Sequence, residues 1–183
     1  MEKVSIFLAD GFEEIEGLTV VDLLRRAGVN AETVSVAGKL DVAGAHGISV
    51  KADVLFEEAD FSDTDMLVLP GGMPGTVHLK EHKGLEKLLI DFYNQEKYIG
   101  AICAAPGILG GLGLLKGRRA CSYPSVEDKL EGAYVVQDPV TVDGRVITSR
   151  GMGTAMAFGL ALIAEARGAE KAEEIRKSVL YAG

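Results

Sequence analysis

The residue best placed to do chemistry is Cys103, which lies between a short apolar stretch, residues 98–102, and a helix expected over residues 104–112. The free N–H groups and the positive end of that helix would point at the sulfur. Such a position stabilises a thiolate, so we expect a lowered pKa for Cys103 and a reactive side chain, with a buried structural cysteine as the alternative. The neighbouring residues are small, as a sharp strand-to-helix turn requires: Gly100, Ala101, Ala104 and Ala105.

Glu16 is the candidate partner of this cysteine. It stands at the start of an apolar stripe that would face the sheet, because apolar residues follow it at helical spacing: Val20, Leu23 and Ala27. Burial beside a thiolate would raise the pKa of Glu16, leaving a neutral acid that donates to sulfur, and the two groups would titrate as a coupled pair. Glu13 and Glu14 are interpreted as ordinary acids of a first helical turn.

A glycine turn at residues 70–72 offers a further component. The backbone N–H groups of Gly71 and Gly72, together with that of Ala104, could form an oxyanion hole beside the cysteine. The tripeptide alone is weak evidence, since most such sequences are simple turns. A phosphate site is disfavoured, because no Walker sequence is present and residues 151–153 lack the third glycine of a dinucleotide fingerprint.

The chain offers few histidines for ordinary cysteine hydrolysis. His78 is interpreted as a surface residue, and the residue after Cys103 is alanine. Tyr123 is a second candidate for the site, with a phenol able to donate a proton, although a half-buried loop aromatic is an equal alternative. Cys121 is interpreted as a core thiol, and the spacing of the two cysteines indicates neither a disulfide framework nor a metal site.

The elements around these residues alternate between strands and helices. This alternation predicts a doubly wound, mainly parallel α/β sheet covered by helices, with the reactive loops at the carboxyl ends of the strands. We expect a hairpin around Gly47 and two strands, 134–136 and 145–149, around an Asp143–Gly144 turn. The main strands are expected at 4–9, 30–36, 65–69, 98–102 and 119–122, and helices at 13–27, 77–95 with breaks near His82 and Gly84, 104–112, 124–130, 151–166 and 169–180.

The composition fits one domain spanning residues 1–183. A hydrophobic fraction of 48% with 23 glycines suits a buried sheet with tight connections, and a net charge of −8 argues against nucleic-acid binding. The apolar run of residues 4–9 is too short for a signal-peptide core or a membrane span, so we expect a cytoplasmic protein without membrane association.

Five segments carry a family resemblance over essentially the whole chain. On these segments the chain resembles the ThiJ/PfpI superfamily, and within it the branch of the human parkinsonism-associated deglycase. The resemblance implies a flavodoxin-like sandwich related to class I glutamine amidotransferases, and a homodimer. It also implies Cys103 as an oxidisable nucleophile, Glu16 as its hydrogen-bonding partner, and backbone N–H groups from Gly72 and Ala104. The segments are residues 9–16 (ADGFEEIE), 23–28 (LLRRAG), 67–72 (LVLPGG), 102–104 (ICA) and 148–154 (TSRGMGT).

Members of this branch are described as cofactor-independent glyoxalases and deglycases acting on methylglyoxal or its adducts, and as oxidative-stress sensors. The protease branch places histidine directly after the cysteine, where this chain has Ala104, so peptidase activity is not expected. Close relatives carry His-Pro where this chain has Tyr123-Pro124; turnover should therefore be slow or rely on Glu16 and Tyr123. We expect a glyoxalase or deglycase, with a sensor or chaperone that forms a Glu16-stabilised sulfinate, or a binding module, as alternatives.

Overall fold

A parallel sheet forms the centre of the molecule. The computed structural model describes residue 1 and residues 3–183. Within them, seven strands form a sheet in the order β10-β11-β7-β6-β1-β2-β5, parallel except for the β10–β11 pair. The chain winds outward in both directions from β1, which confirms the predicted doubly wound, flavodoxin-like fold. The strands are β1 (Lys3–Leu8), β2 (Asn30–Ser35), β5 (Val54–Leu55), β6 (Thr64–Leu69), β7 (Tyr98–Ile102), β10 (Val140–Asp143) and β11 (Val146–Ser149).

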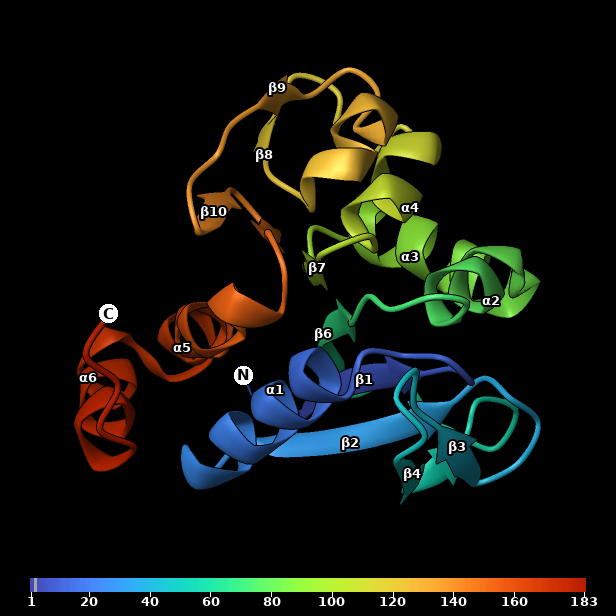
Figure 1. Cartoon of the computed structure of the whole chain (residues 1–183), viewed down its shortest axis with the longest axis horizontal. Coiled ribbons are helices and arrows are strands. Elements are labelled where there is room, and N and C mark those ends of the chain that lie inside the picture. The colour runs from blue at the N-terminus through green and yellow to red at the C-terminus, as the bar shows by residue number, and fades with distance from the viewer. Residues whose placement is uncertain (2) are drawn as a thin grey trace.

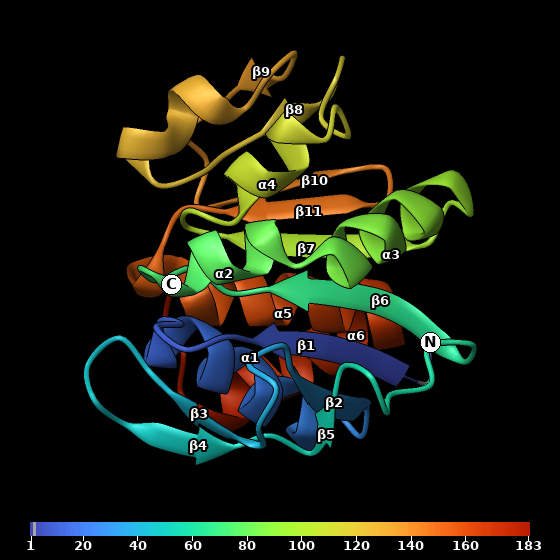
Figure 2. The same cartoon turned by 90° about the vertical axis from the view of Figure 1, so that its right-hand side faces the viewer.

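Helices cover both faces of the sheet. Figures 1 and 2 show α1, α5 and α6 on one side and α2, α3 and α4 on the other. Each side has its own cluster of buried apolar residues against the sheet. No helix among the described residues is both long and apolar enough to cross a bilayer. The helices are α1 (Glu14–Arg26), α2 (Gly75–Glu81), α3 (Lys83–Asn94), α4 (Pro106–Gly111), α5 (Ala155–Arg167) and α6 (Ala169–Ser178), with 3₁₀ turns η1 (Pro124–Lys129) and η2 (Met152–Thr154).

The first helix follows the predicted pattern closely. Its apolar stripe is buried, and Gly28 follows its end with a φ of 72°, a conformation that favours glycine. Asp22 and Arg26 form an i,i+4 ion pair at 2.6 Å. The small residues of α5 let it approach α1, since a β-carbon on Gly159 would lie only 2.6 Å from Leu23 Cδ1. This close packing fixes α1, and therefore Glu16, against the sheet.

A hairpin outside the main sheet holds the loop that precedes α1. Strands β3 (Asp41–Ala43) and β4 (Ser49–Lys51) are antiparallel, which confirms the hairpin predicted around Gly47. The N–H of Gly11 donates to Ala43 O at 2.7 Å, and the carboxylate of Asp10 accepts from the N–H of Ala43 at 2.9 Å. The carboxylate of Asp10 therefore helps to hold this hairpin in place.

The later connections differ from the prediction. The Asp143–Gly144 turn joins β10 to β11, while β9 (Tyr134–Val135) pairs in parallel with β8 (Arg119–Ala120). The expected pairing of residues 134–136 with 145–149 was therefore wrong, because residues 140–143 lie next to the turn and form the strand that pairs with β11. The long helix expected over 77–95 breaks at His82 only, and Gly84 lies inside α3. The imidazole of His82 accepts from Leu85 N–H and caps α3 at this break.

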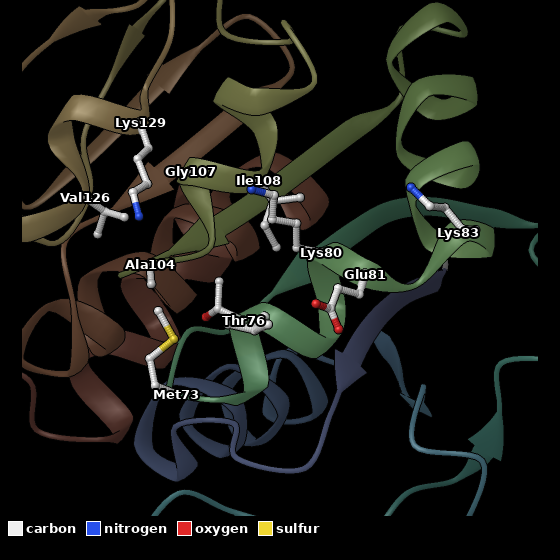
Figure 3. A pocket seen from close by; sticks show the side chains of 11 residues that line it. Met73, Thr76, Lys80, Glu81, Lys83, Ala104, Gly107, Ile108, Val126 and Lys129 are labelled. Carbon is white, nitrogen blue, oxygen red and sulfur yellow. The ribbon is translucent and has the colours of Figure 1, made fainter.

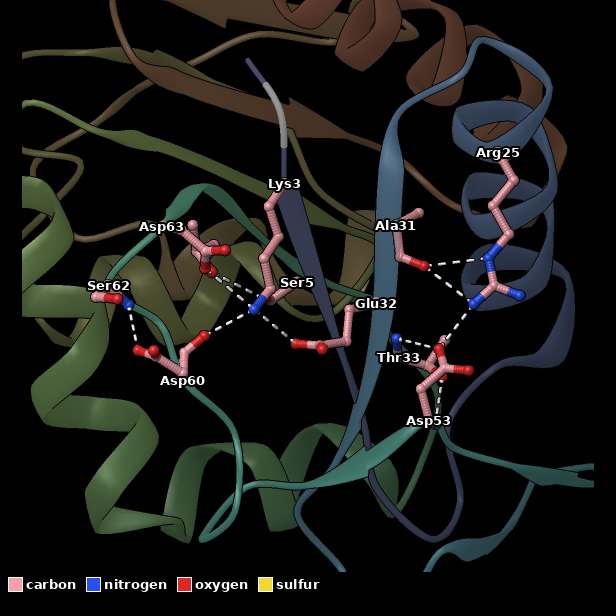
Figure 4. A network of polar contacts seen from close by, with 11 residues as sticks. Lys3, Ser5, Arg25, Ala31, Glu32, Thr33, Asp53, Asp60, Ser62 and Asp63 are labelled. Carbon is pink, nitrogen blue, oxygen red and sulfur yellow. Dashed lines mark hydrogen bonds and ion pairs between the residues drawn. The ribbon is translucent and has the colours of Figure 1, made fainter.

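A network of charged residues stabilises the amino edge of the sheet (Figure 4). Lys3 is 7% exposed, and its ammonium group donates to Asp60 O at 2.7 Å and pairs with Glu32 and Asp63, each at 3.2 Å. Burial alone would lower the pKa of Lys3, but Glu32 and Asp63 outweigh it and raise the pKa. This edge lies at the starts of the strands, opposite the predicted site.

Candidate active site

Three loops meet at the carboxyl edge of the sheet. They follow β1, β6 and β7, which are neighbours in the sheet. They carry Glu16, the glycine turn and Cys103, as the sequence predicted. This is the edge where doubly wound folds bind ligands.

Cys103 occupies a strained turn. Its φ is 64°, in the left-handed region that non-glycine residues rarely adopt. Two backbone hydrogen bonds hold it there: its N–H donates to Ser149 O at 3.0 Å, and its carbonyl accepts from Tyr123 N–H at 2.9 Å. The following helix begins at Pro106, two residues later than predicted, and is only six residues long. The chain therefore makes the expected sharp turn at the cysteine, but with a shorter helix behind it.

Glu16 lies in the buried side of the site. Glu16 is 1% exposed, and its Oε2 accepts a hydrogen bond from Gly71 N–H at 2.8 Å. The carboxyl group also lies beside Cys103, since a β-carbon on Gly71 would lie 2.7 Å from both Glu16 Oε2 and Cys103 Cβ. Burial raises the pKa of Glu16 to about 7, against the opposing effects of the hydrogen bonds from Gly71 and Cys103. Glu16 thus changes protonation near neutral pH, in the direction that its place on the helix predicted.

The pKa of Cys103 moves opposite to the prediction. Burial and, after it, the charge of the Glu16 carboxylate raise the pKa of the thiol to about 12. The backbone N–H groups of Ala104 and Gly72 favour the thiolate and act to lower the pKa of Cys103, but they do not overcome these two effects. The short helix and the two N–H donors lower the pKa of the thiol by less than burial and the neighbouring Glu16 carboxylate raise it. The thiol therefore keeps its proton until a neighbouring base accepts it.

The two glycines of the turn have separate roles. The N–H of Gly71 is engaged by Glu16, so it does not serve the oxyanion hole expected of it. The N–H groups directed at the sulfur are those of Gly72 and Ala104. Glycine at position 71 is required by close approach, since a β-carbon there would lie 2.7 Å from both Cys103 Cβ and Glu16 Oε2.

Tyr123 contacts the site mainly through its backbone. Its side chain is 50% exposed, and its hydroxyl makes no hydrogen bond to any residue that the structure describes. A β-carbon on Gly151 would lie 3.5 Å from the Tyr123 ring and 4.0 Å from Glu16 Oε1. The ring and the carboxyl group therefore both lie near the same side of Gly151, a proximity that sequence spacing could not reveal.

Glu14 lies in the first turn of α1, as interpreted from the sequence, but its carboxylate is buried rather than exposed. It is 5% exposed and accepts hydrogen bonds from His46 N–H at 2.7 Å and Ile48 N–H at 3.4 Å, with His46 Nδ1 at 2.9 Å. Burial alone would raise the pKa of Glu14, but these contacts lower it to about 2. Polar atoms of Glu13, Glu14 and His46 lie within 4.8 Å of one another, so they are the described residues that could hold a cation. In this structure they tie the β3–β4 hairpin to α1.

Other candidate residues lie away from the sulfur. His78 is exposed and its Nδ1 lies 2.8 Å from Asp10 O. Cys121 is buried, with its sulfur 3.6 Å from Thr148 Oγ1, as expected of a core thiol. Arg150 pairs with Glu127 at 3.7 Å. Among the described residues, no histidine contacts Cys103.

A cavity of about 450 Å³ lies between α2, α4 and η1 and reaches Ala104, the residue after the cysteine (Figure 3). Ala104, which follows the cysteine, and Met73, which follows Gly72, lie at one end of it, and Lys83 lies at the other. Ala104, one of the two N–H donors near the sulfur, therefore lines the cavity. The other, Gly72, directly precedes Met73, which also lines it. The sequence alone does not reveal this cavity, because its walls come from segments distant in the chain.

Comparison with known proteins gives a consistent result. Residues 2–165 match the DJ-1/PfpI family. The chain is 39% identical over 98% of its length to "Protein DJ-1 homolog A" of Arabidopsis thaliana, but it spans only 46% of that relative. A protein of Pyrococcus abyssi that is named a deglycase is 36% identical, over 85% of this chain and 94% of its own. The solved structure "Toxoplasma gondii DJ-1, oxidized" matches with a TM-score of 0.96 and 35% identity, covering 100% of both chains.

Proposed function

The chain belongs to the DJ-1/PfpI family, and from this membership and its site we propose that it is a cysteine-dependent, cofactor-independent glyoxalase or deglycase. Its substrates are 2-oxoaldehydes such as methylglyoxal, or their adducts. The observation that carries the proposal is the close approach of Glu16 to Cys103, which lies at a left-handed turn: a β-carbon on Gly71 would lie 2.7 Å from both Cys103 Cβ and Glu16 Oε2. The deglycase name of the Pyrococcus abyssi relative supports this reaction class.

Glu16 acts first as a base. Its pKa of about 7 leaves a carboxylate in much of the protein at neutral pH, in contact with the thiol. As the sulfur of Cys103 bonds to the aldehyde carbon, the thiol proton passes to this carboxylate. The aldehyde oxygen becomes an alkoxide, which accepts hydrogen bonds from the N–H groups of Gly72 and Ala104 and then takes a proton to give a hemithioacetal. The nucleophile is thus supplied by the partly exposed Cys103 and the base by the buried Glu16.

Proton transfer between carbons completes the reaction. Glu16, ionised again, removes the proton from the former aldehyde carbon, and the neighbouring carbonyl carbon receives a proton through an enediol. The product is a thioester of a 2-hydroxy acid. Water adds to the thioester carbonyl, the sulfur leaves and regains a proton, and the 2-hydroxy acid is released. We propose Tyr123 as an additional proton donor to the substrate oxygen, since its ring and the Glu16 carboxyl group both lie near the β-carbon position of Gly151.

The direct experiment follows consumption of methylglyoxal and formation of lactate by the purified protein. Cys103→Ala should reduce turnover to the uncatalysed background, whereas Cys121→Ala should retain it because that thiol is buried in the core. Turnover that persists in purified Cys103→Ala would overturn the proposal.

A second candidate function is oxidative sensing by the same cysteine. It is favoured by the donors around the sulfur, which could stabilise a sulfinate, and by the matching Toxoplasma gondii structure, whose protein is described as oxidised. Hydrogen peroxide would oxidise the thiolate to a sulfenate and then a sulfinate, releasing one water at each step. Mass spectrometry after mild peroxide should find the added oxygens on Cys103. Modification elsewhere, or the same sulfonate yield in wild type and Glu16→Gln, would exclude a Glu16-stabilised sulfinate.

We also propose that the protein is a homodimer. The surface near the start of α1 exposes apolar side chains: Ile15 is 47% exposed and Ile48 is 55% exposed. Ile48 is held beside α1 through its N–H, which donates to Glu14. Sedimentation at micromolar concentration should give a dimer for the wild type and a monomer for an Ile15→Asp/Ile48→Asp variant. A monomeric wild type would disprove this assembly.

A further inference from the structure

The cavity beside Cys103 combines an apolar floor with a cationic rim. The floor is formed by Ala104, Ile108 and Val126, each less than 10% exposed. The rim carries the exposed ammonium groups of Lys80, Lys83 and Lys129. One carboxylate, that of Glu81, lines the same cavity. In a chain of net charge −8, this local excess of positive charge is unusual.

Two of these lysines have free ammonium groups. Lys83 pairs with Glu86 at 2.8 Å. Neither Lys80 nor Lys129 makes an ion pair or hydrogen bond with any residue in the described part of the chain. Their charges are thus available to a ligand in the cavity, without breaking an existing contact.

The positions of the two lysines are set by the fold. The backbone of η1 lies against α4, since a β-carbon on Gly107 would lie 3.4 Å from Lys129 Cβ and one on Gly110 would lie 2.1 Å from Lys129 O. Figure 3 shows Lys129 extending from η1 toward the space beside Ala104 and Val126, and Lys80 extending from α2 toward Ile108. Both ammonium groups therefore line the space that opens at the residue after the nucleophile.

We propose that this cavity selects 2-oxoaldehydes, or their adducts, that carry an anionic group at a distance from the reacting carbonyl. The inference rests on the proposed function and specifies its substrate class. The aldehyde carbon reaches Cys103, the apolar body lies on the floor, and a carboxylate or phosphate is bound by Lys80 and Lys129. Small neutral aldehydes bind without using this subsite.

Chemical labelling tests the subsite without requiring turnover. Bromoacetanilide and its 4-carboxylate derivative alkylate Cys103 with the same leaving group but differ in charge, and a Cys121→Ala background leaves one thiol to report. We expect the ratio of the carboxylate rate to the neutral rate to fall about 2- to 5-fold for Lys80→Gln and again for Lys129→Gln. Lys87→Gln, a charge-matched change on α3 outside the cavity, should leave the ratio unchanged. An unchanged ratio in the Lys80→Gln/Lys129→Gln variant overturns the proposal.

Turnover separates this inference from the proposed function. Phenylglyoxal and 4-carboxyphenylglyoxal share the reacting group, and the wild type should show the larger kcat/KM for the carboxylate, with an advantage that shrinks at high salt. If the wild type showed no turnover but its labelling ratio still depended on Lys80 and Lys129, the proposed function would be disproved and the anion subsite would be retained. Cys103-dependent turnover with no carboxylate preference would disprove the subsite alone. Protection from labelling by benzoate or by phenyl phosphate identifies the anion, and protection by neither counts against the proposal.

Discussion

The carboxyl group of Glu16 lies beside the side chain of Cys103, although the two residues follow different strands of the sheet: a β-carbon on Gly71 would lie 2.7 Å from both Glu16 Oε2 and Cys103 Cβ. Burial raises both pKa values, to about 7 for Glu16 and about 12 for Cys103. The pair therefore holds one negative charge at most around neutral pH, and it is Glu16 that ionises first. The thiolate needed for reaction forms by proton transfer to Glu16 as the sulfur attacks.

The pH dependence of turnover follows from this order of ionisation. Only the carboxylate of Glu16 can accept the thiol proton, so kcat/KM should rise as pH increases through about 7. Glu16→Gln cannot accept a proton, and we expect kcat/KM to fall about 100-fold and to lose this inflection. Glu13→Gln is the comparison variant: it should keep the inflection but move it to lower pH, because the charge of Glu13 is one of the causes that raise the pKa of Glu16. A Glu16→Gln variant that retained the inflection would assign it to another group.

Alkylation reports the pKa of the thiol directly. Because the Glu16 carboxylate is the second cause of the raised pKa of Cys103, after burial, Glu16→Gln should move the alkylation profile to lower pH. At pH 9 we expect alkylation by iodoacetamide to be about tenfold faster in Glu16→Gln than in its parent, both carrying Cys121→Ala. A midpoint below about 8.5 in the parent would instead restore the lowered pKa expected from the sequence.

Local sequence patterns predicted much of the site. The strand-to-turn position of Cys103 and the sheet-facing position of Glu16 each depend on residues close in the chain, and the strand order brings both to one edge. The direction of the thiol pKa could not be predicted, because it depends on burial and on a carboxylate from another element. The engagement of Gly71 N–H by Glu16 is likewise a tertiary contact.

The same distinction explains the errors elsewhere. Glu14 has the sequence features of a solvated acid at a helix start, yet the β3–β4 hairpin folds over it and supplies its hydrogen-bond donors. The Asp143–Gly144 turn was identified correctly, but its preceding strand was not, since a turn signal does not say which of two nearby stretches pairs. Lys80 and Lys129 come together only in the folded chain.

Stability should depend on pH through Glu16. Its pKa is about 7 in the folded protein and about 4.3 in an unfolded chain, so between these values the folded state binds more protons. This contribution to stability is fully present below about 4.3 and is lost as pH rises through 7. In urea unfolding, the free energy of unfolding of the wild type should decrease between pH 5 and pH 8. The decrease for Glu16→Gln should be smaller than that of the wild type by about 1–3 kcal/mol. Equal decreases in wild type and Glu16→Gln would contradict a raised pKa.

Gly71→Ala tests the close packing of the pair. The added β-carbon would lie 2.7 Å from both Cys103 Cβ and Glu16 Oε2, so one of them must move. We expect turnover to fall by about 100-fold, as small displacements of reacting groups do, with a loss of about 1–3 kcal/mol in the free energy of unfolding. Gly111→Ala, which places its β-carbon in open space at the end of α4, is the control and should retain both. Full turnover in Gly71→Ala would show that the pair tolerates displacement.

Tyr123→Phe separates the phenol from the backbone. The variant keeps the N–H that donates to the carbonyl of Cys103 and keeps the ring beside Gly151, but it removes the hydroxyl. If the hydroxyl donates a proton to the substrate oxygen, kcat should fall about 10- to 100-fold while KM changes little, at the lower end because the side chain is half exposed. Tyr134→Phe, on the exposed strand β9, controls for the loss of a tyrosine hydroxyl far from the sulfur and should keep the wild-type kcat. An undiminished kcat in Tyr123→Phe would restrict Tyr123 to positioning Cys103 through its backbone, and Glu16 would then be the sole side chain that moves protons in the reaction.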